Sequence, residues 1–146
     1  MSYNIRLDIA QDGQNQWSLR KDRLTSLIRY HRPDIFGVQE ALPQQMADLK
    51  MALPIFDWYG VGRDDGKNRG EFSAVFYRSD RYEILDNGTF WLSETPDIAG
   101  SLGWDAANIR HAVKLASYKL TSTKRPFFTF ASMKIVFVYL LLVKSA

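Results

Sequence analysis

The run Pro33-Asp34-Ile35-Phe36-Gly37-Val38-Gln39-Glu40 constrains the fold most, because it is a short apolar segment that leaves a proline turn and ends on a carboxylate. Ile35, Phe36 and Val38 predict a buried strand. Such a strand delivers its last residue to the rim of a sheet, where ligands and metals bind in open α/β folds. Glu40 is therefore a candidate site residue, although its spacing alone favours a solvated or helix-capping glutamate.

The amino-acid composition limits which metals and ligands a site at this strand end could bind. The 146 residues suffice for one domain with a real core. Because the chain has no cysteine, disulfides and thiolate metal sites are excluded, and two histidines, His31 and His111, are too few for the usual zinc sites. Oxygen-ligated Mg²⁺ or Ca²⁺ stays open. The net charge of +3 permits an anionic substrate without requiring one.

Hydrophobic periodicity predicts alternating strands and helices, and therefore an α/β sandwich. Helices are expected over 17–31, with Ser18 as N-cap, and over 43–53, with Met46 and Met51 in the core. The segment Asp86-Asn87-Gly88 predicts either a bulge or a tight turn, because Asn-Gly readily adopts positive φ. The expected strands are 2–8, 35–40, 56–62, 71–78, 82–85, 89–92, 110–120 and one beginning at 127.

Five segments, in this order, resemble the endonuclease/exonuclease/phosphatase family, which has the DNase-I-like fold. They are Tyr3–Arg6, Pro33–Glu40, Gly70–Arg78, Gly88–Pro96 and Trp104–Ala107. The resemblance covers roughly residues 1 to 130 and corresponds to the N-terminal half of such a domain. It implies part of a four-layer α/β sandwich, with a mixed, mainly antiparallel sheet flanked by helices.

The same resemblance assigns roles to four residues. Glu40 matches the glutamate that holds Mg²⁺ or another divalent cation, and Asn4 matches the asparagine that supports the metal and contacts the scissile phosphate. Glu71 resembles the acidic residue that orients a catalytic histidine. Arg110 resembles an arginine near the scissile phosphate, although its neighbours depart from the family pattern. Without the resemblance, structural explanations are favoured: Asn4 caps a strand edge, Glu71 is an exposed charge at a strand end, and Arg110 is a surface cation.

The function implied is that of a Mg²⁺-dependent phosphodiesterase or phosphatase acting on a phosphate ester, nucleic acid included. In the family, the strand matching Phe127–Ser132 leads into a His-x-Asp segment, and Asp-x-Asn and Asp-His follow later; the sequence has none of these. We therefore expect the chain alone to be inactive. The alternative is a non-catalytic remnant that binds anions or nucleic acid weakly through the basic helix and the Arg63–Arg69 loop.

These departures divide the chain into residues 1–132, the N-terminal part of a family domain, and an apolar tail at 133–146. The apolar run Ile135–Val143 has nine residues, whereas a membrane-spanning helix needs about 20, so no span is expected. A buried strand is one structure open to it, and a truncated or out-of-frame terminus is our hypothesis for its origin. We expect self-association through exposed apolar surface. Because the N-terminus lacks the apolar segment of a signal peptide, a cytoplasmic location is expected.

Overall fold

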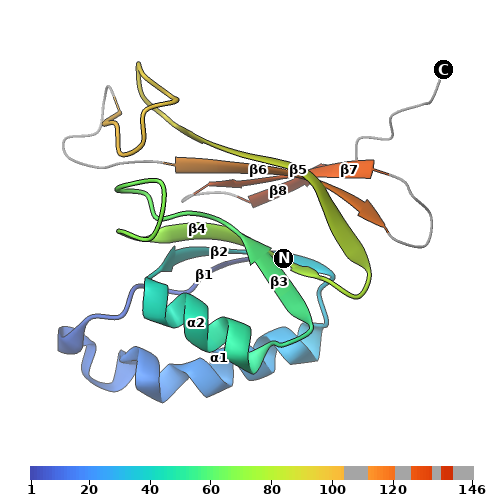
Figure 1. Cartoon of the computed structure of the whole chain (residues 1–146). Helices are drawn as coiled ribbons and strands as arrows, with labels where there is room; N and C mark the ends of the chain where they lie inside the picture. Colours follow the sequence, from blue (N-terminus) through green and yellow to red (C-terminus); the bar gives the residue numbers. More distant parts are fainter. Residues whose placement is uncertain (104–111, 121–125, 133–135, 140–146) are drawn as a thin grey trace.

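The computed structural model describes residues 1–103 in full and the backbone of three further strands, at 112–120, 126–132 and 136–139. Figure 1 shows the chain as two sheets with helices on one side. The elements in chain order are β1 (Ser2–Asn4), a 3₁₀ segment (Ala10–Asn15), α1 (Trp17–His31), β2 (Ile35–Ala41), α2 (Pro43–Ala52), β3 (Phe56–Tyr59), β4 (Phe72–Arg78), β5 (Tyr82–Trp91), β6 (Ala112–Leu120), β7 (Pro126–Ser132) and β8 (Val136–Tyr139).

The first sheet is mixed and has the strand order β1-β2-β4-β3. β1 runs parallel to β2, whereas β4 runs antiparallel to both β2 and β3. The carboxyl ends of β1 and β2 and the beginning of β4 therefore lie at the same edge of the sheet. This edge receives the last residues of the first two strands and the residue that precedes the third.

The second sheet is antiparallel throughout, in the order β5-β6-β7-β8. The strands expected at 82–85 and 89–92 are one continuous strand, β5, so the tight turn is absent. The register shift lies between Ile84 and Asp86, just before the segment in which the bulge was predicted, and Asp86, Asn87 and Gly88 themselves pair regularly with β6. β8 lies within the apolar tail and pairs with β7. Residues 136–139 of the tail thus form a strand; the rest of the tail lies outside the described residues.

The layers follow from the apolar faces of these elements. Figure 1 shows α1 and α2 on one side of the first sheet and the second sheet on its other side. Phe36 is fully buried between helices and sheet, where its ring stacks on Phe76 with centroids 4.9 Å apart. Ile35 and Val75, on the opposite face, are buried toward the second sheet, because β4 also packs against β6 and β7. The partial α/β sandwich expected from the sequence is confirmed.

Three local predictions are wrong. The first strand ends at Asn4 rather than residue 8, because Arg6 adopts a positive φ of 56° that breaks the extended backbone. Ser18 does not cap α1: the N-cap is Gln16, and the Trp17 amide donates to the Asp8 carboxylate instead (3.3 Å). Met51 is 78% exposed, whereas Met46 is buried as expected. All three depend on tertiary neighbours that periodicity does not contain.

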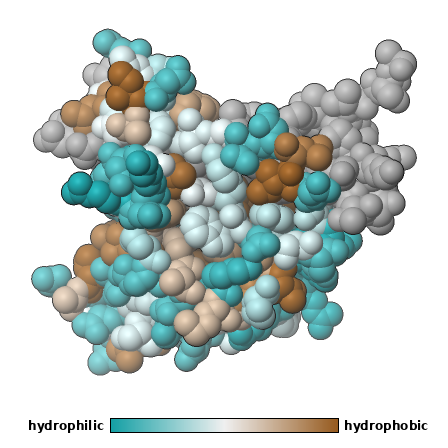
Figure 2. Space-filling model, in the orientation of Figure 1, coloured by the Kyte–Doolittle hydropathy of each residue, from teal (hydrophilic) through white to brown (hydrophobic). Residues whose placement is uncertain are grey.

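Within the described residues, no helix is long and apolar enough to cross a membrane. The large apolar side chains that are exposed include Leu19, Tyr30 and Ile55. On the face shown in Figure 2, hydrophobic residues (brown) form separate groups between hydrophilic ones. Self-association and a cytoplasmic location both stay predictions.

Candidate functional site

Asn4 and Glu40 meet at the carboxyl ends of the two parallel strands. Asn4 is the last residue of β1 and is paired in register with Gln39 of β2. Its side-chain Nδ2 donates a hydrogen bond of 2.7 Å to Oε1 of Glu40. This contact links residues 36 apart in sequence and fixes one carboxylate oxygen. The structure thus brings together the two residues that the sequence singled out first.

Glu40 occupies a β-bulge with an unusual backbone conformation. The register between β2 and β4 shifts between Val38 and Ala41, and Glu40 has a φ of +60°. A side chain other than glycine rarely adopts this left-handed region, and holding it there costs about 1–3 kcal/mol. A bulge re-aims a side chain next to a functional site. Here it coincides with the carboxylate's contact to Asn4.

This conformation leads to a stability prediction. Glu40→Gly is expected to be about 1 kcal/mol more stable than Glu40→Ala, because glycine adopts positive φ without strain while both variants lose the hydrogen bond to Asn4. Urea unfolding measures the difference. At the exposed Ala47, in the middle of α2, the order should reverse: Ala47→Gly should be about 1 kcal/mol less stable than wild type, since glycine weakens a regular helix. Equal stabilities of the two Glu40 variants would contradict the bulge geometry.

Glu71 lies at the same edge of the sheet, one residue before β4. Its neighbour Phe72 pairs with Ala41, immediately after Glu40. The carboxylate forms an ion pair with Arg63, Nη1 to Oε2 at 3.0 Å, and only 13% of its side chain is exposed. Burial raises the pKa of Glu71; Arg63 opposes this effect, while the negative charges of Glu40 and Asp64 add to it. Glu40 is thus close enough to act on Glu71 electrostatically.

The raised pKa of Glu71 predicts a pH-dependent stability difference. A carboxyl whose pKa is higher in the folded state than in the unfolded state stabilises the fold when protonated, and this contribution is lost as the pH rises through the folded-state pKa. The stability of Glu71→Gln relative to wild type should therefore be constant well below pH 4.5, the ordinary value, rise as the pH passes from there through the higher folded-state pKa of Glu71, and level off above it. Chemical unfolding with EDTA present, with Glu94→Gln as surface control, measures this. A difference that stays flat with pH would contradict the burial of Glu71.

The loop that follows β1 is held by a buried glutamine of α2. Gln45 is fully buried; its Oε1 accepts hydrogen bonds from the amides of Asp8 (3.1 Å) and Leu42 (2.9 Å), and its Nε2 donates to the Arg6 carbonyl (3.0 Å). The Arg6 amide in turn donates to Oδ1 of Asn4 (2.9 Å). Gln45 is therefore a positioning residue for the backbone that carries Asn4.

A groove of about 630 Å³ opens beside Asn4, between β1 and α1. Arg6, Arg20 and Arg23 line it. Arg20 donates to the carbonyls of Ile5, Arg6 and Asn15, and Arg6 forms an ion pair with Asp12. Much of this basic surface is thus engaged in holding the fold.

The groups at this edge of the sheet that could bind a metal ion are mainly side-chain oxygen atoms. Among residues 1–103, no group of three or more His, Asp or Glu side chains is arranged to hold a metal. Two nearby carboxylates and an amide suit a hard divalent cation that keeps several waters, whereas zinc needs more protein ligands. A cation there would also relieve the repulsion between Glu40 and Glu71. The donor set therefore fits Mg²⁺.

Of the four residues assigned from the sequence, the structure places Asn4, Glu40 and Glu71 at one edge; Arg110 lies outside the described residues. Arg63, the partner of Glu71, was not predicted from the sequence. Arg63 and Glu71 lie at the two ends of a loop that the Gly62–Phe72 bridge closes. Treating this loop as hairpin-like would have predicted that its two ends, and therefore Arg63 and Glu71, lie side by side. Gln45 was not predicted either, because periodicity gave no sign of it.

The fold and site define a two-sheet α/β sandwich with an acidic centre at its strand ends. The sequence model of the endonuclease/exonuclease/phosphatase family matches residues 1–132 of this chain. The chain belongs to this family, whose members are hydrolases that act on phosphoester bonds and generally use divalent metals. An uncharacterised protein of Acanthamoeba polyphaga mimivirus, R895, is 30% identical in an alignment of 131 positions that covers 78% of this chain and 19% of that protein.

Solved structures agree with the family and the fold. An endonuclease/exonuclease/phosphatase from Bacteroides vulgatus has a TM-score of 0.87 and 46% identity over 90% of this chain and 50% of its own. A mannosyl-6-phosphatase from Bacteroides thetaiotaomicron has a TM-score of 0.84 and 44% identity over 88% of this chain and 48% of its own. The chain thus spans about half the length of these relatives.

Proposed function

We propose that this chain carries the metal-binding and phosphate-contacting part of a divalent-metal-dependent phosphatase site, with sugar phosphates as the substrate class. One observation carries the proposal: the Asn4–Glu40 hydrogen bond of 2.7 Å at the carboxyl ends of two parallel strands. The 44% identity to a mannosyl-6-phosphatase supports the substrate class.

Three residues at this edge have distinct roles. Glu40 is the metal ligand: its Oε1 is held by Asn4, and Oε2 lies outside that hydrogen bond. Asn4 orients this carboxylate and lies at the mouth of the groove beside β1. Glu71, fixed by Arg63, adds a second negative charge at the same edge. A bound Mg²⁺ would supply neutralisation of the charge on the phosphate ester.

We further propose that the 146 residues alone bind substrate without turning it over. Hydrolysis needs a base that activates water. His31, the one histidine among the described residues, ends α1, next to the start of β2 and not its Glu40 end. We place the family part at residues 1–132 and the tail at 133–146.

The test is calorimetric titration with mannose 6-phosphate, with and without Mg²⁺, accompanied by phosphate-release assays. We expect binding that requires Mg²⁺ and disappears in Glu40→Gln, with no phosphate release. Mg²⁺-dependent release that Glu40→Gln abolishes would support the hydrolase site and overturn the inactivity. Salt-sensitive binding of an oligonucleotide, equal in wild type and Glu40→Gln, together with no binding of mannose 6-phosphate, would instead establish the non-catalytic alternative.

A further inference from the structure

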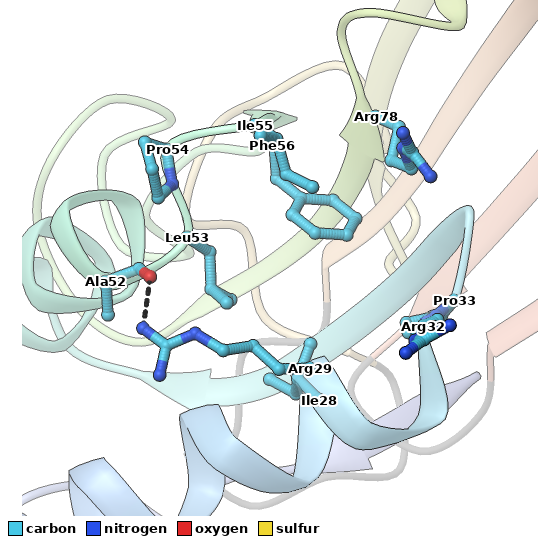
Figure 3. A pocket seen from close by; sticks show the side chains of 10 residues that line it. All are labelled: Ile28, Arg29, Arg32, Pro33, Ala52, Leu53, Pro54, Ile55, Phe56 and Arg78. Atoms are coloured by element: carbon cyan, nitrogen blue, oxygen red, sulfur yellow. Dashed lines mark hydrogen bonds between the residues drawn. The ribbon is translucent and has the colours of Figure 1, made fainter.

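A second concave site lies at the end of the first sheet opposite Glu40. The cavity has a volume of about 380 Å³ and is enclosed by the end of α1, the start of β2, the connection from α2 to β3, and the end of β4. Figure 3 shows its lining. This volume falls within the range of small-molecule sites. The cavity shares no residue with the site around Asn4 and Glu40, so a ligand bound there is independent of the proposed function.

The inner part of the cavity is apolar. Ile28, Leu53 and Phe56 are almost fully buried (0%, 2% and 4% exposed), and in Figure 3 the side chains of Leu53 and Phe56 project into the space between the surrounding elements. Ile55, at the rim, is 51% exposed. Because Ile28, Leu53 and Phe56 are already covered, the apolar surface that a ligand could bury here is mainly that of Pro54 and Ile55, both exposed and both in the lining; this favours a ligand with an apolar body.

Three arginines surround this apolar interior. Arg29 lies across one side, where its Nη2 donates to the carbonyl of Ala52, the last residue of α2 (2.7 Å). Arg32 and Arg78 stand at the other side in Figure 3. Arg78 is paired with Asp80 through Nε and Nη2, which leaves Nη1 outside that pair. Arg32 makes no ion pair within the part of the chain that the structure describes.

The surrounding charges leave the rim positive. Asp80 pairs with Arg78, and Asp34, the other nearby carboxylate, pairs with Arg81. Carbonyl groups at the carboxyl ends of both helices already accept hydrogen bonds: that of Ile28 from the Arg32 amide, and that of Ala52 from the Arg29 side chain. Arg29 and Arg32 are thus not neutralised by carboxylates of the described residues. Both are exposed, so an anion at the rim would be attracted to them with a strength that falls as salt is added.

We propose that this cavity binds a small organic anion in which an apolar body of about the size of one or two rings carries one carboxylate. The apolar body lies against Pro54 and Ile55, above the buried Leu53 and Phe56. The carboxylate lies at the rim beside Arg32, whose planar guanidinium matches it with two parallel hydrogen bonds. Neutral or cationic molecules of the same shape lack this interaction and bind more weakly.

The experiment is a calorimetric titration of the intact chain with 2-naphthoate, 2-naphthamide and 2-naphthylmethylammonium, three probes that share one ring system and differ in charge. We expect 2-naphthoate to bind with a submillimolar Kd. The amide should bind at least about tenfold more weakly, because it lacks the charge-assisted hydrogen bond, and the ammonium should not bind, because its positive charge is repelled by the arginines. Failure of 2-naphthoate to bind, or equal binding of the amide, overturns the proposal.

Variants locate the bound anion. Arg32→Gln is expected to weaken 2-naphthoate about tenfold or more, and Ile55→Ser, at an exposed position, should weaken all binding without unfolding the chain. Arg23→Gln, on the helix before Arg32 but outside the cavity, is the matched control and should leave the Kd unchanged. Thermal melting of each variant verifies that it is folded. Binding that survives both Arg32→Gln and Ile55→Ser lies elsewhere and overturns the proposal.

Discussion

Glu40→Gln is expected to weaken Mg²⁺ binding by about 100-fold or more, because the substitution removes a charged ligand and loss of an outer-shell partner alone typically costs about 10–100-fold. Asn4→Ala should weaken it about tenfold, since Asn4 only orients the carboxylate through Nδ2. Isothermal calorimetry or competition with Mn²⁺ measures both affinities. The difference in Mg²⁺ affinity between the two variants distinguishes Glu40, which binds the metal, from Asn4, which orients Glu40.

The matched control for this result is Asp22→Asn, which makes the same change of charge at an exposed position of α1. It should leave Mg²⁺ affinity within about twofold, because Asp22 lies on α1 rather than at the strand ends that carry Glu40, and exposed charges are screened at moderate salt. A loss of affinity as large as that of Glu40→Gln would mean that net charge rather than a site attracts the metal.

Gln45→Leu is the variant with the largest expected effect on stability. Leucine fits the buried volume but leaves the amides of Asp8 and Leu42 and the carbonyl of Arg6 without this partner. At about 1 kcal/mol for each lost hydrogen bond, the free energy of unfolding should fall by about 3 kcal/mol. Urea unfolding monitored by far-UV circular dichroism measures the loss.

The neighbouring glutamine provides the control for Gln45. Gln44 is exposed on the same turn of α2, so Gln44→Leu should change the free energy of unfolding by less than about 0.5 kcal/mol. Because Gln45 holds the backbone that leads to Asn4, Gln45→Leu should also weaken Mg²⁺ binding at temperatures where it stays folded. Equal stabilities of the two leucine variants would show that the three hydrogen bonds contribute nothing net.

The sequence predicted the elements whose apolar faces repeat regularly. β2, α2 and β4 lie within two residues of their expected bounds, because each has a continuous buried face whose period identifies it. The fold class followed from their order and from the family resemblance. Glu40 was a candidate from its place at the end of a predicted strand, and the resemblance gave it a role and added Asn4 and Glu71; the structure shows that the three share one edge of the sheet.

The features that the sequence did not reveal depend on the backbone and on long-range contacts. The positive φ of Glu40 follows from an extra residue opposite β4, and no propensity of glutamate predicts it. The sequence of α2 predicts a simple amphipathic helix, in which a glutamine would be exposed. Gln45 is nevertheless fully buried, because its amide forms hydrogen bonds with three backbone groups there. Ser18 was a reasonable N-cap by residue type, but Asp8 supplied the acceptor from outside the helix.

The arginine-rimmed cavity and the carboxylate of Glu40 lie at opposite ends of β2. Its start at Ile35 follows the arginine-rimmed cavity near Pro33, and its end carries Glu40. One strand thus separates a region that favours an organic anion from one that favours a cation. A variant at either end is therefore a natural control for the other.

The most direct test of the metal site is paramagnetic broadening of backbone amide signals as Mn²⁺ is added to the ¹⁵N-labelled chain. A metal held by Glu40 predicts that the signals of Asn4, Glu40 and Glu71 broaden first, that those of Arg32 and Ile55 at the other end of the sheet stay sharp, and that Mg²⁺ reverses the effect. Broadening that begins elsewhere, or that is unchanged in Glu40→Gln, would contradict it.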